Sequence, residues 1–436
     1  MIQGIVFTCI LILSIYFFSK RIGQIRKNIF LGRDEARNDR PWDRWKVMFR
    51  VAFGQSKMAA RPTVALLHFF VYAGFIIVNI EILEIIIDGI FGTHRVLSFY
   101  IPMGLYNFLI GTFEYLALMV WVACFVFLIR RNVMKISRFW SSEMKIGPRT
   151  DANLILIIEI LLMTAFLMMN AADYLLQKQN YGHYIVAGSF PVSNYLRPLF
   201  LSFSTDTLFL VERFCWWFHI VFILLFLNYV PYSKHLHILL SFPNTWYSNL
   251  NAKGAFTNMT SVTNEVKMML DPTIVPDVNG VPTRFGAKDV ADLTWKQLMD
   301  AYSCTECGRC TSECPANITG KKLSPRKIMM DTRDRLEEFG MGVQKNGAAF
   351  DDGKSLLFDY VSEEELWACT SCNACVQACP VNIDPLSIIL DLRRFLVMEQ
   401  SSAPSEINSM FSNIENNGAP WKFPSSDRMV WSETGV

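Results

Sequence analysis

Eight of the eleven cysteines in this chain stand in two short, similar motifs toward its carboxyl end. The first reads CTECGRCTSECP from residue 304, the second reads CTSCNACVQACP from residue 369, and both fit C-x2-C-x2-C-x3-C-P. Cysteines clustered in this way, outside a small secreted protein, are typical of metal ligands and not of disulfides. Three thiolates two residues apart can wrap three corners of a cubane, so the two motifs predict two [4Fe–4S] clusters.

The fourth cysteine of each motif follows a longer gap and precedes a proline, so it leaves in a different direction. In two-cluster ferredoxins this cysteine ligates the other cluster, and we expect the same crosswise sharing here. One cluster takes Cys304, Cys307, Cys310 and Cys379, and the other takes Cys369, Cys372, Cys375 and Cys314. Structural zinc is the alternative, but zinc ribbons use two separated CxxC pairs, which two four-cysteine motifs ending in proline do not resemble.

Histidine is scarce, with six residues in the whole chain. His219 and His237 lie 18 positions apart, which is five helical turns, so on one helix both rings would leave the same face about 27 Å apart. His235 would then point to the opposite side. His68 lies at about the depth of His237, and two imidazoles facing each other at one depth are what a six-coordinate haem b requires. A hydrogen-bonded packing role is the alternative for each of these histidines.

The elements that must position these residues divide the chain into two halves. The chain is 52% hydrophobic and 18% charged, whereas about a quarter of an average soluble domain is charged. The apolar excess falls in five runs, each long enough to cross a bilayer: roughly 2–18, 64–90, 106–129, 153–176 and 207–242. The first run has no preceding basic region and no small-residue cleavage site, so we expect a retained helix and not a signal peptide.

Lysine and arginine gather between runs one and two and between runs three and four, whereas the other two loops carry few. The positive-inside rule therefore puts the N-terminus outside and the C-terminal module in the cytoplasm, in the inner membrane of a prokaryote. The net charge of +2 is too small to indicate that the protein binds nucleic acid.

The membrane half resembles the gamma subunit of respiratory nitrate reductase and related membrane cytochromes b. The resemblance rests on LLHFFVYAGF around His68 and on WWFHIVFILLFLNYVPYSKHLHIL, which contains His219 and His237. It implies that His68 and His237 bind a haem b on the cytoplasmic side. It also puts the partner of His219, for a second haem, near position 78, where this chain has Val78 and Asn79.

The second haem therefore stays open: it is absent, or its missing ligand is His94 or His183 from the outer loops. Four carboxylates in the apolar runs are also notable. They line a quinone or proton path, or they snorkel or pair with Arg213. They are Glu81, Glu84, Glu114 and Glu159.

The second half resembles the helical, heterodisulfide reductase C-like ferredoxin domain, and the iron–sulfur subunits of glycerol-3-phosphate and succinate dehydrogenases. The matching segments are LTWKQLMDAYSCTECGRCTSECPA, LSPRKIMMDTRD and the second cysteine motif. We therefore predict a mainly α protein: a five-helix transmembrane bundle (1–245), a juxtamembrane linker (246–293), a cytoplasmic α-helical two-cluster ferredoxin domain (294–398) and a polar partner-docking tail (399–436). Disorder is the alternative for the tail.

These resemblances imply an oxidoreductase subunit that passes electrons between a cytoplasmic iron–sulfur or flavoprotein partner and the (mena)quinone pool. The sequence shows no flavin or nicotinamide motif and no CCG-type cysteine domain. Resemblance to electron-transfer-flavoprotein:menaquinone oxidoreductases implies a separate CCG-domain iron–sulfur subunit and electron-transfer flavoprotein as partners. The alternatives are a heterodisulfide-reductase-like quinol:disulfide oxidoreductase and a non-redox scaffold with structural clusters.

Overall fold

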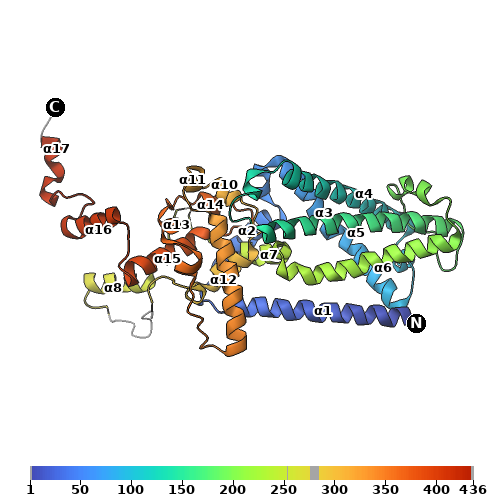
Figure 1. Ribbon diagram of the computed structural model, residues 1–436, viewed down its shortest axis with the longest axis horizontal. Helices are drawn as coiled ribbons and strands as arrows, with labels where there is room; N and C mark the ends of the chain where they lie inside the picture. Colours follow the sequence, from blue (N-terminus) through green and yellow to red (C-terminus); the bar gives the residue numbers. More distant parts are fainter. Residues whose placement is uncertain (1, 253, 275–283, 434–436) are drawn as a thin grey trace.

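The computed structural model describes residues 2–252, 254–274 and 284–433. Five long helices lie side by side at one end of the molecule, and shorter helices form a compact group at the other (Figure 1). Within the described residues the β structure consists of two isolated bridges. The prediction of a mainly α protein with five transmembrane helices is confirmed.

The long helices are all long and apolar enough to cross a membrane. Helices α3 to α6 each pack against the next one along the chain, and α1 packs against α3 and α6. Large apolar side chains such as Phe7, Phe113, Phe166 and Ile220 fill the space between them. The long helices are α1 (Ile2–Ile29), α3 (Pro62–Phe91), α4 (Met103–Leu128), α5 (Ile146–Lys178) and α6 (Thr205–Tyr229).

The shorter helices near the membrane end and in the linker are α2 (Pro41–Met48), α7 (His237–Trp246) and α8 (Thr260–Leu270). Those around the cysteine motifs are α9 (Trp295–Ser303), α10 (Arg309–Ser312), α11 (Pro315–Ile318), α12 (Pro325–Asn346), α13 (Glu363–Trp367), α14 (Ala374–Ala378) and α15 (Pro385–Glu399). We call residues 284–399 the cysteine module. The tail carries α16 (Ser405–Asn417) and α17 (Val430–Glu433), which extend away from this module (Figure 1).

The predicted linker and tail are described only in part. Residues 253 and 275–283 of the linker and 434–436 of the tail lie outside the described residues. The side chains of α16 and α17 are exposed or half-buried, and Trp431 keeps 74% of its surface exposed. The predicted domain boundaries and the docking role of the tail stay predictions.

The end of α1 packs into the hydrophobic core of the cysteine module, which is separate from the core of the membrane bundle. Helix α1 has 28 residues and is about 42 Å long, whereas the hydrocarbon layer is about 30 Å thick. Its last turns leave the membrane, and Ile25 and Ile29 pack into the core of the module, where Leu236 joins them. The chain beyond α1 is tied to the same place, because the Arg33 amide donates to the Leu293 carbonyl at 2.7 Å. The module is therefore held rigidly on the end of the bundle.

The fifth apolar run is not one continuous helix, so the prediction that His219 and His237 share one helix face is wrong. Helix α6 ends at Tyr229, α7 begins at His237, and two short 3-10 turns join them. Pro231 lies in the first turn, and a proline cannot donate the backbone hydrogen bond that would continue the helix. The 18-residue spacing therefore does not set the relative direction of the two rings.

Candidate iron–sulfur and haem sites

The two cysteine motifs fold into turns with matching backbone geometry. Glu306 and Ser371 occupy equivalent positions with φ of 53° and 56°, and Gly308 and Asn373 do so with φ of 70° and 61°. Glycine and asparagine tolerate this left-handed region best. The turn directs amide groups toward the sulfurs, and the Ser371 N–H lies 3.4 Å from the Cys369 Sγ. Each motif is thus a preformed loop whose thiols and amides face the same space.

One group of four thiols lines a small pocket. Apolar side chains from α15, including Leu386 and Ile389, form its back wall. The thiols come from both motifs: three belong to the second motif and one is the last cysteine of the first. They are Cys314, Cys369, Cys372 and Cys375. This grouping is the one that crosswise sharing requires.

The other group lies where Cys379 approaches the first motif. Burial raises the pKa of the Cys379 thiol to about 11, and the neighbouring Cys307 thiol adds to this shift. Burial raises the pKa of Cys310 as well, and so do the thiols of Cys307, Cys304 and Cys379 and, last, that of Cys375 from the other group. Since thiols interact in this way only at short range, the last cysteine of the second motif lies near the first three of the first motif, and the two groups are neighbours.

Each group offers four thiols from two segments of the chain, which is the number that a cubane needs. A tetrahedral zinc site needs its donors to converge on one point, whereas the irons of a cubane lie at separate corners, each with its own thiolate. Sharing two cysteines crosswise also ties together segments that lie more than fifty residues apart in the sequence.

His68 and His237 come together at the end of the bundle that carries the cysteine module. They are close enough for their charges to interact. The His237 Nδ1 donates to the Lys234 carbonyl at 3.1 Å, and the His68 Nδ1 lies 3.1 Å from the Gln55 Oε1. A histidine whose Nδ1–H is held in this way keeps its Nε2 lone pair for a metal. Both Nε2 atoms would therefore be available to hold a metal-bearing group such as haem.

His235 lies beside this pair and does not point away from it, as a continuous helix would require. Its ring centre is 5.5 Å from that of His237 and 5.5 Å from that of Phe226. Burial lowers the pKa of His235 to about 3, and the nearby His237 and His68 lower it further. The 3-10 turns before α7 cause this placement, because they rotate the chain differently from an α-helix.

His219 lies deeper in the bundle and is 2% exposed. Its Nδ1 donates to the Leu162 carbonyl at 3.0 Å, so its Nε2 is also free to ligate. At the positions where the resemblance puts its partner, Val78 is buried and the Asn79 amide bonds the Phe75 carbonyl. The structure thus provides no second ligand from α3 for a haem at His219.

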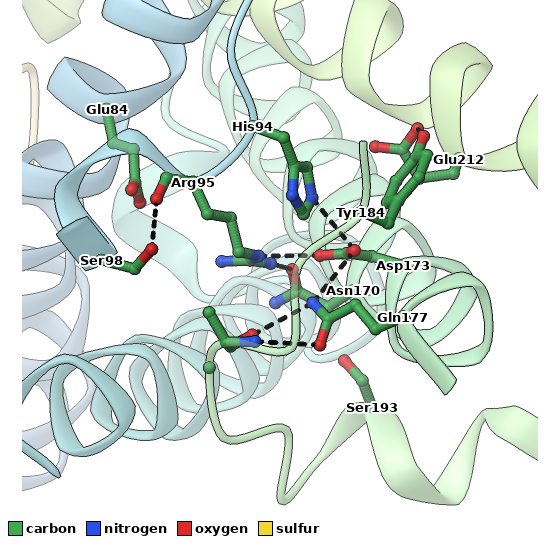
Figure 2. Close-up of polar contacts among 12 residues, drawn as sticks. Glu84, His94, Arg95, Ser98, Asn170, Asp173, Gln177, Tyr184, Ser193 and Glu212 are labelled. Atoms are coloured by element: carbon green, nitrogen blue, oxygen red, sulfur yellow. Dashed lines mark hydrogen bonds and ion pairs between the residues drawn. The ribbon is translucent and has the colours of Figure 1, made fainter. Parts of the chain in front are cut away.

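His94 belongs to a separate polar network with Arg95 and Asp173 (Figure 2), and His183 packs against its ring. The His94 Nε2 lies 3.1 Å from an Asp173 oxygen, and its ring centre is 5.8 Å from that of His183. Arg95 forms a 2.7 Å ion pair with the other Asp173 oxygen and donates to Asn170 at 2.8 Å. His94 is therefore engaged with a carboxylate at the end of α5.

This network also accounts for three of the four carboxylates noted in the sequence. Glu84 accepts the Tyr106 hydroxyl at 2.9 Å, Glu114 accepts two backbone amides of the α5–α6 connection, and Glu81 lies 3.9 Å from Arg95. Arg213 pairs with its neighbour Glu212 instead. Sequence reasoning missed Arg95 as the central cation, although a lone arginine between two apolar runs was a usable signal.

A short chain of contacts joins the thiols of the first group to His68. The Lys57 ammonium donates to the Cys379 carbonyl at 3.1 Å, and Arg309 donates from Nη1 to the Lys57 carbonyl at 3.1 Å. Arg309 is 5% exposed and is close enough to both Cys379 and His68 for its charge to act on each. Its Nη2 is buried without a hydrogen-bond partner. An unpaired guanidinium nitrogen beside the histidine pair suits a carboxylate-bearing group such as haem.

Comparisons with known proteins agree with the cysteine chemistry. Residues 303–383 match the family described as "4Fe-4S dicluster domain". The chain is 28% identical to "Probable iron-sulfur-binding oxidoreductase FadF" of Bacillus subtilis, over 97% of this chain and 59% of that protein. It is 28% identical to "EtfAB:quinone oxidoreductase" of Syntrophomonas wolfei, over 92% of this chain and 55% of that protein.

A third relative covers mainly the cysteine module. It is one of the subunits of the "Ferredoxin/F(420)H(2)-dependent CoB-CoM heterodisulfide reductase" from Methanosarcina acetivorans, 37% identical over 27% of this chain and 60% of that protein. No solved structure is significantly similar. The chain spans less than two thirds of the length of each of these three relatives. Residues 303–383 are a 4Fe-4S dicluster domain, and the chain that carries them is similar along nearly its whole length to iron–sulfur oxidoreductases.

Proposed function

We propose that this chain is the membrane-embedded electron-transfer subunit of a quinone-linked oxidoreductase. In this proposal two [4Fe–4S] clusters and one haem b connect a cytoplasmic partner with the (mena)quinone pool. The observation that supports the proposal best is that Lys57 donates to the Cys379 carbonyl and Arg309 donates to the Lys57 carbonyl, while the charge of Arg309 acts on His68.

The residues that would hold each group follow from the geometry. The cluster nearer the membrane is held by Cys304, Cys307, Cys310 and Cys379, and the farther one by Cys314, Cys369, Cys372 and Cys375. His68 and His237 hold the haem through Nε2. When bound, these groups supply reversible one-electron transfer.

The exposure of the cysteines indicates which thiol group faces a partner protein and which faces the membrane helices. Cys379 is 8% exposed and faces the membrane junction, whereas Cys372 of the farther group is exposed. A partner protein therefore meets the Cys372 side, and the bundle meets the Cys379 side. Lys57, which precedes α3, and Arg309, in the cysteine module, each donate a hydrogen bond to a backbone carbonyl across the junction between the membrane bundle and the module.

We place the cysteine module in the cytoplasm. The basic loops before α3 and between α4 and α5 lie at the module's end of the bundle, where Arg33 bonds Leu293 and Glu143 pairs with Arg326 at 2.6 Å. Cytoplasmic loops are the ones that carry excess lysine and arginine. Five crossings then leave the N-terminus outside, at the opposite end of α1 (Figure 1).

The partners follow from the names of the relatives. One relative is an EtfAB:quinone oxidoreductase by name, so we propose electron-transfer flavoprotein as the electron donor and menaquinone as the acceptor. We further propose that an iron–sulfur protein with a CCG domain links the donor to this chain. The exposed aromatic residues of the tail, such as Trp421 and Trp431, offer a surface for such a protein.

A heterodisulfide-reductase-like quinol:disulfide oxidoreductase is the second candidate. It is favoured by the 37% identity to part of a heterodisulfide reductase, which is confined to 27% of this chain. Similarity to the EtfAB:quinone oxidoreductase extends over 92% of the chain and includes the membrane helices. We therefore give preference to the flavoprotein-linked function.

The deciding experiment is purification of the intact complex from membranes, with measurement of iron, acid-labile sulfide, zinc and haem per chain. We expect about eight irons and about eight sulfides, with one haem b that a menaquinol analogue reduces. Co-purifying electron-transfer flavoprotein supports the first candidate, and thiol–disulfide activity with quinol supports the second. Zinc in place of iron, or haem absent from the intact complex, would refute the proposal.

A further inference from the structure

A cavity with no role in the proposed electron transfer lies at the module's end of α4 and α5. It opens to the surface where the π-helical turn after α4, a short 3-10 turn and the start of α5 meet. Its lining combines two arginines, two asparagines and two aromatic rings. These are Arg131, Arg149, Asn132, Asn153, Phe139 and Trp140.

The two arginines lie over aromatic rings, and among the described residues neither forms an ion pair. The Arg131 guanidinium stacks over Phe139 at 4.6 Å and that of Arg149 stacks over Trp140 at 4.7 Å. Arg131 also bonds Asn153 weakly, at 3.4 Å. Among the described residues neither guanidinium has a carboxylate within ion-pair distance. The stacked faces leave the N–H edges of both guanidinium groups available to an anion.

Nearby carboxylates are committed elsewhere. Asp151, on α5, accepts the Tyr229 hydroxyl at 2.5 Å and pairs with Lys234 at 3.7 Å. Glu143 pairs with Arg326 of the cysteine module at 2.6 Å. Glu306, whose charge also acts on Arg131, pairs with Lys234 at 2.6 Å and with Arg333 at 2.9 Å. Among the described residues, the two arginines of the cavity therefore form no ion pair of their own.

The surroundings of the cavity identify the kind of anion. Ile146 in its wall is 79% exposed, and Val133 and Met134 beside it are 73% and 61% exposed. Such apolar surface at the end of two membrane helices faces lipid, and tryptophan is typical of this interfacial depth. A soluble anion would leave the apolar rim exposed, whereas a phospholipid covers the rim and the arginines together.

We propose that this cavity binds the headgroup phosphate of an anionic phospholipid. Arg131 and Arg149 donate to the phosphate oxygens, and Ile146 contacts the glycerol and acyl chains. Asn132 and Asn153 bond each other, and Asn153 also accepts from Arg131, so this pair helps to hold that guanidinium in place. Basic pockets between transmembrane helices on the cytoplasmic side have the chemistry for such headgroups. The site is independent of the redox groups and does not rest on the proposed function.

The test compares the full chain with Arg131→Gln/Arg149→Gln and a matched control, Arg130→Gln/Lys145→Gln. The control removes the same charge from the same loop, at positions that do not line the cavity. Each protein is placed in nanodiscs with equal phosphatidylglycerol and phosphatidylcholine, and bound lipid is measured by native mass spectrometry. We expect retained phosphatidylglycerol to fall about tenfold in the cavity variant and to be unchanged in the control. Arg131→Lys/Arg149→Lys should recover part of the binding if the cavity variant still folds.

Three results would overturn the proposal. Wild-type chain without preference for phosphatidylglycerol would show that no anionic headgroup is selected. An equal loss of phosphatidylglycerol in the cavity variant and in the control variant would show that the lipid responds to the general surface charge and not to the cavity. Displacement of the lipid by millimolar inorganic phosphate would show that a free anion, and not a lipid, is the ligand.

Discussion

Crosswise sharing of cysteines makes a prediction that separates it sharply from ligation within each motif. Cys314 belongs to the first motif by sequence but lines the cavity of Cys369, Cys372 and Cys375. The Cys314→Ala variant should therefore lose the cluster farther from the membrane and retain the nearer one. Because each cluster holds four irons, iron should fall from about eight to about four per chain.

Double variants test whether Cys314 shares a cluster with Cys369 of the second motif or with Cys304 of its own motif. If Cys314 and Cys369 serve one cluster, Cys314→Ala/Cys369→Ala should lose no more iron than Cys314→Ala alone, at about four irons per chain. Cys314→Ala/Cys304→Ala should lose both clusters, because Cys304 belongs to the other group. Cys9→Ala, at an exposed position far from the module, is the control and should keep all the iron.

The assay is iron and acid-labile sulfide per chain in the purified full-length protein, with electron paramagnetic resonance of the reduced sample to count the clusters. Haem content, measured on the same sample, checks that the membrane half is still folded. The reverse pattern, with iron lost additively in Cys314→Ala/Cys369→Ala and not in Cys314→Ala/Cys304→Ala, would refute crosswise sharing.

Two further predictions follow from the junction. His68→Ala or His237→Ala should abolish the haem b absorption band, whereas His235→Ala should retain it. The reason is that, of these three rings, those of His68 and His237 have Nδ1 held by a neighbouring oxygen. Loss of haem in all three variants would contradict this assignment. Glu143→Gln should lower the stability of the chain by about 2 kcal/mol, measured as a lower melting temperature at pH 7. Burial would raise the pKa of Glu143, but the hydrogen bond from Arg326 holds the pKa below its ordinary value of 4.5. The ion pair therefore stabilises the chain at neutral pH, and this stabilisation is lost as the pH falls from 4.5 through the lower pKa of the folded state. If wild type and variant still differed in stability at pH 4 as much as at pH 7, the predicted pH dependence would be wrong.

Features that local patterns encode could be predicted from the sequence. The spacing of the two cysteine motifs implied the cluster type, and the apolar runs located the five membrane helices. Both predictions succeed for the same reason: a ligand loop and a transmembrane helix each satisfy their main requirement within about twenty consecutive residues.

Local periodicity failed where the backbone departs from a regular helix. The 18-residue spacing of His219 and His237 suggested one helix face, but Pro231 ends α6 and the 3-10 turns bring His235 beside His237. The pairing of His68 with His237 was predicted from their similar depth and from the resemblance of the membrane half to a known family. It stays a prediction, although the two rings are close enough for their charges to interact.

Contacts between distant segments could be learned only from the folded chain. Arg95 meets Asp173 across 78 positions, the last turns of α1 enter the core of the cysteine module, and Arg309 reaches the neighbourhood of His68. Each contact depends on how helices cross and on which loop folds over which end of the bundle. No repeat of 3.6 residues carries that information, because packing is chosen by the shapes and charges of surfaces that the chain brings together only on folding.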